Sequence, residues 1–353
     1  MNNDRIGAKV SRRELLIWSG LLPLGQWLQT PPAAQEKEKI MQHPKNIYDC
    51  LIVGGGSAGL SAALTLGRAR RRVLVCDKGN PRNAPAPESH GFLTRDGVSP
   101  LELLNIARDQ LRPYRTVQFQ TLGVREILKT SAGFEAAFED GSRKRARKIL
   151  LAFGVKDEFP AIENFGDFWG KSVFYCPYCH GFEVRDQPLA VVGNGAAAIG
   201  MAALLKNWSA DLVLCTNGPA ELSADQRTLL KNQKVALREE KIVRLEGQNG
   251  HLENIVFETG QKLARGGMLI RPKQKLRSDL AEKLGCELNE MGFIKTTALN
   301  ETTVQGVYAA GDVTSPMQSL AVAVSQGAVA AGGGINHALS EEDFAAFDSK
   351  ATP

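Results

Sequence analysis

Two parts of the chain show the same order of apolar and polar positions. In the first, a short apolar run over 48–53 leads into a glycine-rich turn over 54–59, and a helical stretch over 60–70 follows. A second apolar run, 73–76, comes next. Apolar runs that alternate with helical stretches are typical of buried parallel strands joined by crossover helices. The region therefore predicts a strand–turn–helix–strand unit of about 30 residues.

The glycines of this turn, Gly54, Gly56 and Gly59, have separate tasks in such a unit. The first makes the tight turn, the second lets the backbone approach a pyrophosphate, and the third allows close packing of helix on strand. The helix N-terminus offers unpaired N–H groups to phosphate oxygens. Asp77 follows the second apolar run, where a carboxylate can accept hydrogen bonds from both ribose hydroxyls. The unit therefore predicts a dinucleotide site.

A second unit with the same order spans 188–215, with its helical stretch expected over 199–208. The segment 216–220 that follows contains neither an acid for a ribose nor an arginine cluster for a 2′-phosphate. The turn is therefore either a working nicotinamide nucleotide site or a scaffold without a ligand. The residues that would form such a site are Gly193, Gly195 and Ala196.

Between the two units lies Cys176-Pro177-Tyr178-Cys179-His180-Gly181. Two thiols at this spacing can close into a disulfide and store two electrons, or they can form half of a metal site. The other four cysteines lie singly, and a four-cysteine zinc site would need a second close pair. We therefore expect a redox pair and no metal. The proline suits the first turn of a helix, whose dipole would stabilise a thiolate.

Near the end of the chain, a strand-like run over 306–313 delivers Gly311 and Asp312 to a turn, and small apolar residues at helical spacing follow over 318–331. A carboxylate at the end of this strand can bind a ribityl hydroxyl while the helix N-terminus points at a phosphate. The alternative is that Asp312 caps the following helix, which requires no ligand.

Composition and charge narrow the function classes. A chain of 353 residues is too long for one ordinary core, and 43% hydrophobic with 23% charged residues is typical of a soluble protein of two domains. The formal net charge is +5, but the basic run 143–148 directly precedes an apolar strand. We therefore expect a solvated hairpin there and no nucleic acid partner.

The first 45 residues contain a segment that resembles an export signal. Residues 11–16, Ser-Arg-Arg-Glu-Leu-Leu, are similar to a twin-arginine motif, and a modest apolar stretch over 15–28 and a Pro-Ala segment over 31–34 follow. The apolar stretch is too short for a stable membrane span. Export to the periplasm by the twin-arginine route is the expectation, and a cytoplasmic location is the alternative.

In order and spacing, these motifs resemble the low-molecular-weight thioredoxin reductase family over residues 46–340. The resemblance implies an α/β fold with two Rossmann-like nucleotide-binding domains, FAD as cofactor and a homodimer. The FAD-binding domain is discontinuous, and an NAD(P)-type domain that carries the Cys-x-x-Cys pair is inserted into it. The implied divisions are 1–45 for signal peptide and linker, 46–157 and 274–341 for the FAD-binding domain, 158–273 for the inserted domain, and 342–353 for a C-terminal tail.

The resemblance also implies residue roles. Cys179 would lie next to the flavin ring, Cys176 would exchange with substrate, and Gln318 would lie near the ring. The other residues implied to hold FAD are Gly54, Gly56, Ser57, Ala58, Gly59, Asp77, Lys78, Arg82, Asn83, Gly311 and Asp312.

The chain departs from authentic thioredoxin reductases in two places. They have an aspartate after the second cysteine, whereas this chain has His180, and the stretch resembles instead the branch that includes gliotoxin and holomycin dithiol oxidases. A histidine can deprotonate an incoming thiol, although it could also cap a local turn or pack on Tyr178. In the second place, 216–219 replaces the basic motif of the reductases and leaves NADPH use open.

We therefore predict an FAD-dependent thiol–disulfide oxidoreductase in which electrons pass between flavin, the cysteine pair and a substrate. An NADPH-independent dithiol oxidase is favoured, because the periplasm supplies no NADPH and the basic motif is missing. The alternatives are an NADPH-dependent thioredoxin-disulfide reductase and a flavin-binding redox protein without turnover. The partner is a small dithiol or disulfide or a thioredoxin-like protein, and the sequence does not choose between them.

Overall fold

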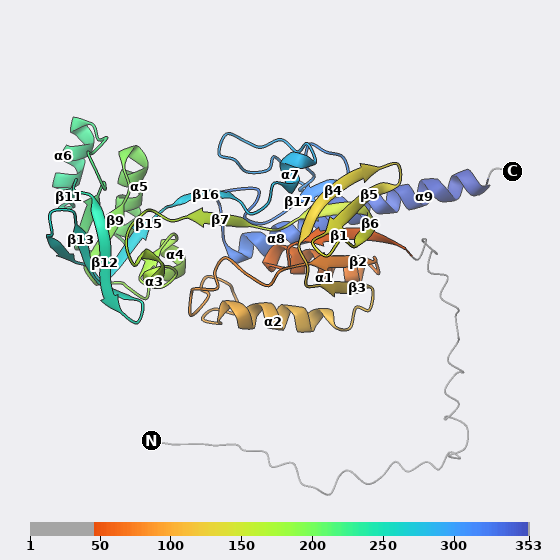
Figure 1. Ribbon diagram of the computed structural model, residues 1–353, viewed down its shortest axis with the longest axis horizontal. Coiled ribbons are helices and arrows are strands. Elements are labelled where there is room, and N and C mark those ends of the chain that lie inside the picture. The colour runs from red at the N-terminus through yellow and green to blue at the C-terminus, as the bar shows by residue number, and fades with distance from the viewer. Residues whose placement is uncertain (1–45, 352–353) are drawn as a thin grey trace, which may run out of the picture. The chain divides into compact units, whose positions relative to one another are not determined.

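The larger sheet of the computed structural model, which describes residues 46–351, has seven strands (Figure 1). Its order is β3-β2-β1-β6-β5-β4, and β17 also pairs with β6. The pairs among β1, β2, β3, β6 and β17 are parallel, whereas β4 and β5 form antiparallel hairpins. The strands are β1 (Ile47–Val53), β2 (Val73–Cys76), β3 (Val117–Gln120), β4 (Val124–Thr130), β5 (Gly133–Phe138), β6 (Arg143–Leu151) and β17 (Val307–Ala309).

Alternating residues of β1 point into two different cores, because successive side chains of a strand face opposite sides of the sheet. Cys50 and Ile52 pack with α1, α2 and the C-terminal helices, whereas Leu51 and Val53 pack with β4–β6 and α7. The sheet is therefore covered on both faces. The helices are α1 (Ser57–Arg68), α2 (Pro100–Leu111), α7 (Leu280–Lys283), α8 (Leu320–Val329), the π-helix η1 (Ala330–Asn336) and α9 (His337–Ala351).

A second, fully parallel sheet with the order β11-β10-β9-β15-β8 lies in the middle of the chain, together with a three-stranded antiparallel sheet, β12-β13-β14. Its strands are β8 (Val173–Phe174), β9 (Leu189–Val192), β10 (Leu212–Cys215), β11 (Ala236–Arg238) and β15 (Gly267–Ile270), and the antiparallel strands are β12 (Ile242–Gln248), β13 (His251–Phe257) and β14 (Lys262–Ala264). The helices are α3 (Phe165–Phe168), α4 (Pro177–His180), α5 (Gly195–Leu205) and α6 (Ala224–Asn232).

An antiparallel two-stranded ladder joins the two groups of elements (Figure 1). One strand, β7 (Val155–Glu158), leads into the inserted group, and the other, β16 (Lys273–Leu276), leads back. The predicted α/β class with two nucleotide-binding folds is confirmed. None of the helices in 46–351 has both the length and the apolar character that crossing a membrane requires. The predicted export signal, 1–45, lies outside the described residues.

Both glycine turns differ in one respect from the expected boundaries. The helix expected over 60–70 is α1, which begins at Ser57 and ends at Arg68, and the helix expected over 199–208 is α5, which begins at Gly195 and ends at Leu205. In each case the turn residues themselves form the first helical turn. The N–H groups of the turn are thus those of a helix N-terminus.

The basic run 143–148 forms a hairpin, as expected, but only its first part is solvated. Arg143 and Arg145 are exposed and pair with Glu135 on β5, whereas the side chains of Arg147 and Lys148 are 17% and 9% exposed. Arg147 Nη1 lies 2.7 Å from Asp343 Oδ1, and Lys148 pairs with Glu342. These carboxylates lie on α9, which continues past residue 342 into the segment expected to be a tail.

Candidate active site

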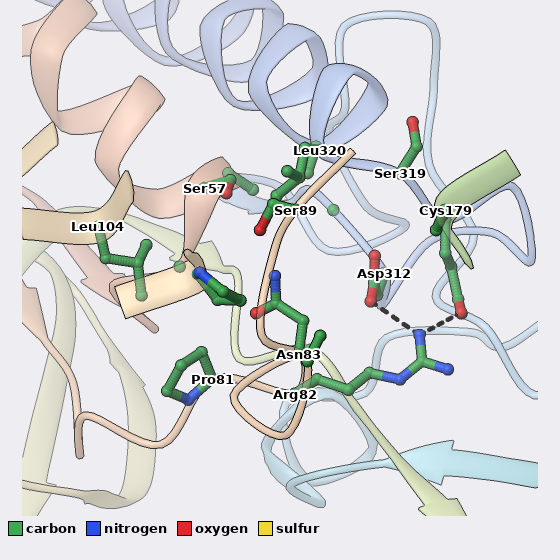
Figure 2. Close-up of a pocket in the computed structure, with 18 of the residues that line it drawn as sticks. Ser57, Pro81, Arg82, Asn83, Ser89, Leu104, Cys179, Asp312, Ser319 and Leu320 are labelled. Carbon is green, nitrogen blue, oxygen red and sulfur yellow. Dashed lines mark hydrogen bonds and ion pairs between the residues drawn. The ribbon is translucent and has the colours of Figure 1, made fainter. Parts of the chain in front are cut away.

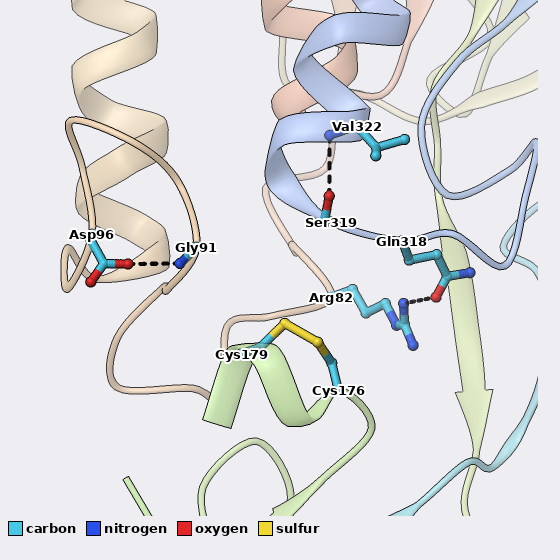
Figure 3. Close-up of a disulfide and its surroundings, with 8 residues drawn as sticks. All are labelled: Arg82, Gly91, Asp96, Cys176, Cys179, Gln318, Ser319 and Val322. Atoms are coloured by element: carbon cyan, nitrogen blue, oxygen red, sulfur yellow. Dashed lines mark hydrogen bonds between the residues drawn. A yellow bond between two sulfur atoms is a disulfide. The ribbon is translucent and has the colours of Figure 1, made fainter. Parts of the chain in front are cut away.

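Cys176 and Cys179 form a disulfide with a Cα–Cα distance of 5.3 Å (Figure 3). Cys176 has an extended backbone at the N-cap of α4, and Pro177 holds the first helical position, where its missing N–H costs nothing. The Cys179 N–H donates to the Cys176 carbonyl, 3.2 Å away. Both cysteines are half-buried. The helical turn therefore carries a disulfide between its two cysteines, as the sequence predicts.

The other cysteines are chemically separate from this pair. Cys50, Cys76, Cys215 and Cys286 are free thiols in the cores. Burial raises the pKa of Cys76 and of Cys215 to about 12, and the pKa values of Cys50 and Cys286 are also raised by burial. Since exchange requires a thiolate, these four cysteines behave as small hydrophobic residues.

The disulfide lines a cavity that most of the predicted site residues also line (Figure 2). Elements far apart in the sequence contribute to it: the first glycine turn, the segment after β2, the redox turn at α4 and the start of α8. The predicted residues that line it are Gly54, Gly56, Ser57, Ala58, Asp77, Arg82, Asn83, Cys176, Cys179, His180, Gly311, Asp312 and Gln318.

Five predicted residues do not line this cavity. Gly59 packs under the first turn, and Lys78 is exposed and pairs with Glu139. The second glycine turn also lies outside, so Gly193, Gly195 and Ala196 are not part of this cavity. The structure thus assembles the first turn, the redox pair and the Gly311-Asp312 turn, but not the second turn, around one space.

The first glycine turn is shaped to receive a ligand from one side. Gly54 has a φ of +110°, and a Cβ there would lie 2.3 Å from the Ala152 carbonyl oxygen. A Cβ on Gly59 would lie 1.9 Å from the Gly54 carbonyl oxygen. A Cβ on Gly56 would meet nothing within 4 Å, and no side chain caps α1. Gly54 and Gly59, which have no room for a Cβ, form the turn. Gly56 faces free space beside the unpaired N–H groups of the helix N-terminus.

Arg82 connects the carboxylates on the opposite side of the cavity (Figure 2). Its guanidinium donates two hydrogen bonds to Asp157, each 2.7 Å, and a third to Asp312, 3.1 Å. It also donates to Gln318 and lies 5.2 Å from the centre of the Tyr175 ring. Burial raises the pKa of Asp312, and Arg82 opposes that rise. Asp312 therefore does not cap α8, whose N-cap is Ser319.

His180 is the last residue of α4 and lines the same cavity. Its ring stacks on Phe174, with the centroids 6.1 Å apart, rather than on Tyr178, which contacts Trp208 edge-on. Burial lowers the pKa of His180, although Glu183 and the Gly170 backbone oppose this. Neither ring nitrogen makes a hydrogen bond of acceptable geometry. A half-buried imidazole that is neutral is suited to accept a proton from a thiol.

Sequence reasoning missed several residues of the site. Asp157, which accepts hydrogen bonds from Arg82, lies in β7, and Ser89 and His90 come from the long segment between β2 and α2. The Ser89 hydroxyl and His90 Nε2 are buried without a hydrogen bond. The only available signal was that polar residues follow a strand of a nucleotide fold, and it does not distinguish these residues from solvated loop residues.

The second glycine turn is occupied by side chains and loops of the protein itself. Asn194 Oδ1 accepts from the N–H of Gly195, 2.9 Å, and from that of Glu221, 2.8 Å, while its Nδ2 donates to the Pro219 carbonyl, 2.9 Å. The helix N-terminus that would meet a phosphate is therefore capped from within. The segment 219–221 is held across the turn by the same side chain.

Arginines do reach this edge of the second sheet, contrary to the expectation from the sequence. Strand β11 pairs in parallel with β10, so Arg238 stands beside Cys215, and Arg227 approaches from α6. Each guanidinium is already paired: Arg238 with Glu240 at 2.7 Å, and Arg227 with Glu239 at 2.7 Å. Their charge is therefore offset by carboxylates of the same chain.

Known proteins are similar to this chain over most of its length. Residues 48–327 match the model of the pyridine nucleotide-disulphide oxidoreductase family. The thioredoxin reductase aclD of Aspergillus oryzae is 35% identical over 317 residues, covering 86% of this chain and 98% of its own. The thioredoxin reductase sirT of Leptosphaeria maculans is 33% identical over 321 residues, covering 85% and 97%. The crystal structure of the putative thioredoxin reductase TrxB from Bacillus anthracis is similar with a TM-score of 0.79 at 38% identity, covering 84% of this chain and 99% of that one.

Proposed function

The chain belongs to the pyridine nucleotide-disulphide oxidoreductase family, and on that premise we propose that it is an FAD-dependent dithiol oxidase that works without NADPH. Membership, with thioredoxin reductase-like relatives, makes it an enzyme that acts on sulfur groups. The observation that carries the proposal is the contrast between the two glycine turns. The open turn shares a cavity with the disulfide, whereas the other is capped by Asn194.

The residues of the cavity fit a flavin dinucleotide. Gly56 has free space where a pyrophosphate would approach, and the uncapped N-terminus of α1 lies beside it. Asp77 and Asp312 lie at strand ends on the two sides, and Ser89 has an unpaired buried hydroxyl. These residues would hold the cofactor. When bound, the flavin would take two electrons from the reduced cysteine pair and pass them to molecular oxygen.

The chain's own residues carry out the exchange with the substrate dithiol. One substrate thiol loses its proton to His180, and the resulting thiolate attacks the Cys176 sulfur. The Cys176–Cys179 bond breaks, a mixed disulfide forms, and Cys179 leaves as a thiolate. The second substrate thiol then displaces Cys176. The substrate has lost two electrons and two protons and closes to a disulfide, and the pair has gained the two electrons.

The cavity favours this order of events. His180 and the two cysteines line one space, so a thiol that enters it can meet the base and the disulfide together. Burial of His180 lowers its pKa and keeps it neutral near pH 7, which is the form that accepts a proton. The assignment of Cys176 as the attacked sulfur comes from the family resemblance, since both cysteines are half-buried.

Anaerobic stopped-flow reduction of the purified holoprotein tests the proposal. We expect flavin bleaching by a dithiol such as reduced lipoamide, and recovery of the absorbance on admission of air. NADPH and NADH should bleach the flavin slowly or not at all. Fast bleaching by NADPH at micromolar concentration would show instead that a nicotinamide nucleotide reduces the protein.

Replacement of the exchange thiol provides the sharpest mutational test. Cys176→Ser should lower dithiol-dependent turnover about 1000-fold or more, because no disulfide remains for the substrate to attack. Cys286→Ser is the matched control, since Cys286 is buried in the core beside Thr302 and away from the cavity. It should keep turnover close to that of the natural protein. Full dithiol turnover by Cys176→Ser would refute the exchange mechanism.

A second candidate is an NADPH-dependent thioredoxin-disulfide reductase, which the printed names of the relatives favour. In that case the reduced pair would reduce a thioredoxin-like protein. The paired carboxylates at Arg227 and Arg238 weigh against a 2′-phosphate site at this edge. The same stopped-flow comparison separates the two candidates.

A further inference from the structure

His90 lies in a half-buried position among three carboxylates. Its Nε2 is 3.3 Å from Glu88 and 3.5 Å from Glu183, and its Nδ1 is 3.4 Å from Asp96. The His90 side chain is 19% exposed, whereas these carboxylates are 43–66% exposed. The imidazole therefore stands between the interior of the cavity and acidic groups that reach water.

The loop that carries His90 is held in a defined shape beside α4 (Figure 3). The isolated bridge between Ser89 and Val98 closes it, and Asp96 accepts from the N–H of Gly91, 2.7 Å. Glu183, in contrast, follows α4 in the inserted group. The contact between His90 and Glu183 thus joins the loop to the redox turn.

His90 and His180 line the same cavity, and both have nitrogens without a hydrogen bond. These are His90 Nε2 and both ring nitrogens of His180. The contacts of His90 Nε2 with Glu88 and Glu183 are ion-pair distances without hydrogen-bond geometry. Buried polar atoms are rarely left unpaired, so these nitrogens mark a place where a proton or a ligand group enters. Among the described residues, no group of three possible ligands converges as a metal site.

The two neighbours act on His180 in opposite directions. Glu183 raises the pKa of His180 by stabilising its charged form, and His90 lowers it by repulsion when it is itself protonated. A proton on His90 therefore disfavours the charged form of His180. Glu183 Oε1 lies 3.5 Å from His90 Nε2, so this carboxylate can receive a proton from the His90 ring.

We propose that His90 and Glu183 are positioning residues that remove the proton His180 takes from the substrate thiol and deliver it to solvent. This proposal rests on the proposed dithiol oxidation. The S–H bond of the substrate breaks, the electron pair stays on sulfur for attack on Cys176, and the proton passes from His180 to His90 and then through Glu183, Glu88 or Asp96 to water. His180 is thereby neutral again when the second substrate thiol must be deprotonated.

The test compares His90→Asn with Glu183→Gln in anaerobic stopped-flow reduction by reduced lipoamide across pH. Each variant should reduce the flavin about tenfold more slowly at the optimum, because a proton-transfer group is lost. The acid limb of the pH–rate profile should move in opposite directions. It should shift upward by about half a pH unit in His90→Asn and downward by a similar amount in Glu183→Gln.

The signs follow from the charge on His180. Its neutral form is active, so the rate falls as pH drops through its pKa. Removal of His90 removes a repelling proton and raises that pKa, whereas removal of the Glu183 charge lowers it. A purely structural role would lower the rate without moving the two limbs apart. Flavin content and thermal unfolding confirm that the variants are folded, and Glu183→Gln changes a side chain that is 43% exposed.

His337→Asn is the matched control, because His337 is exposed on α9 and also faces a glutamate, Glu341, at 3.5 Å. Its rate and acid limb should equal those of the natural protein. If the acid limbs of the pH–rate profiles do not move, or move the same way in both variants, proton transfer through His90 and Glu183 is overturned. Bleaching of the natural protein by a dithiol would in that case still uphold the dithiol oxidase. If a dithiol does not bleach the natural protein at all, the oxidase and the relay are both overturned.

Discussion

The two glycine turns begin from similar sequences and end in different chemical states. Both follow a buried parallel strand and open a helix. The turn at Gly54–Gly59 leaves the N-terminus of α1 uncapped and Gly56 facing free space. At the other turn, Asn194 caps α5 and holds the segment 219–221. The first turn therefore keeps its backbone donors available to a ligand, whereas the second does not.

The charged residues at the two sheet edges show the same contrast. Asp77, at the end of β2, lines the open cavity and contacts Arg108 at 3.0 Å. At the edge of the inserted sheet, Arg238 and Arg227 are each paired with a glutamate. The first edge thus presents a carboxylate to the open cavity, whereas the cations of the second edge are offset by glutamates.

The largest effect is expected at Gly59. Gly59→Ala would place a Cβ 1.9 Å from the Gly54 carbonyl oxygen, so the packing of helix on turn must open. We expect a loss of about 3 kcal/mol in the free energy of unfolding, with loss of bound flavin. Urea unfolding measures the first quantity and absorbance the second.

Gly200→Ala provides the matched control in the second unit. Gly200 lies inside α5, and a Cβ there would meet nothing within 4 Å. This substitution should be neutral or stabilise the protein by up to about 1 kcal/mol, because alanine is the better helix former. Equal destabilisation by the two variants would contradict the special role of Gly59.

A smaller and more selective effect is expected at Gly56. Gly56→Ala should leave the unfolding free energy within about 0.5 kcal/mol, since Gly56 has a φ of −78° and free space around its Cβ position. The methyl group would occupy the approach to the pyrophosphate, so the Kd for FAD should rise about tenfold or more. Titration of apoprotein with FAD by fluorescence quenching measures it.

Gly166→Ala is a suitable comparison for this experiment. It also adds a methyl group in open space, but in α3 of the inserted group. Its affinity for FAD should not change. An unchanged Kd in Gly56→Ala would mean that the cofactor does not approach the first turn at this residue.

The smallest effect is expected at the second turn. Asn194→Ala removes the cap of α5 and the tie to the segment 219–221, and should cost about 1 kcal/mol of stability. Thermal unfolding measures this loss. The rate of bleaching by a dithiol should stay the same, and bleaching by NADPH should remain slow because Glu239 and Glu240 still stand at the edge. A clear loss of dithiol reduction would show that the second turn takes part in the reaction.

Features that depend on neighbouring residues could be predicted from the sequence. The tight turn at Gly54, the helix N-terminal position of Pro177 and the delivery of Asp312 to a turn all follow from local backbone geometry. Strand and helix types were predicted correctly at both nucleotide units, whereas helix boundaries shifted by a few residues. Such boundaries depend on which turn residues supply the first helical turn.

Short motifs in a fixed order were therefore enough to specify the family, the α/β fold and the cysteine pair. Which glycine turn stays open, and which groups surround the disulfide, depends on tertiary packing. Asn194 caps α5 locally, but its bond to the segment 219–221 depends on where that segment folds. Arg238 reaches the edge of the inserted sheet because β11 pairs with β10. His90 and Glu183 are far apart in the chain, and no periodic pattern links the two segments that carry them. Such contacts arise from packing between elements, and a pattern along the chain cannot predict them.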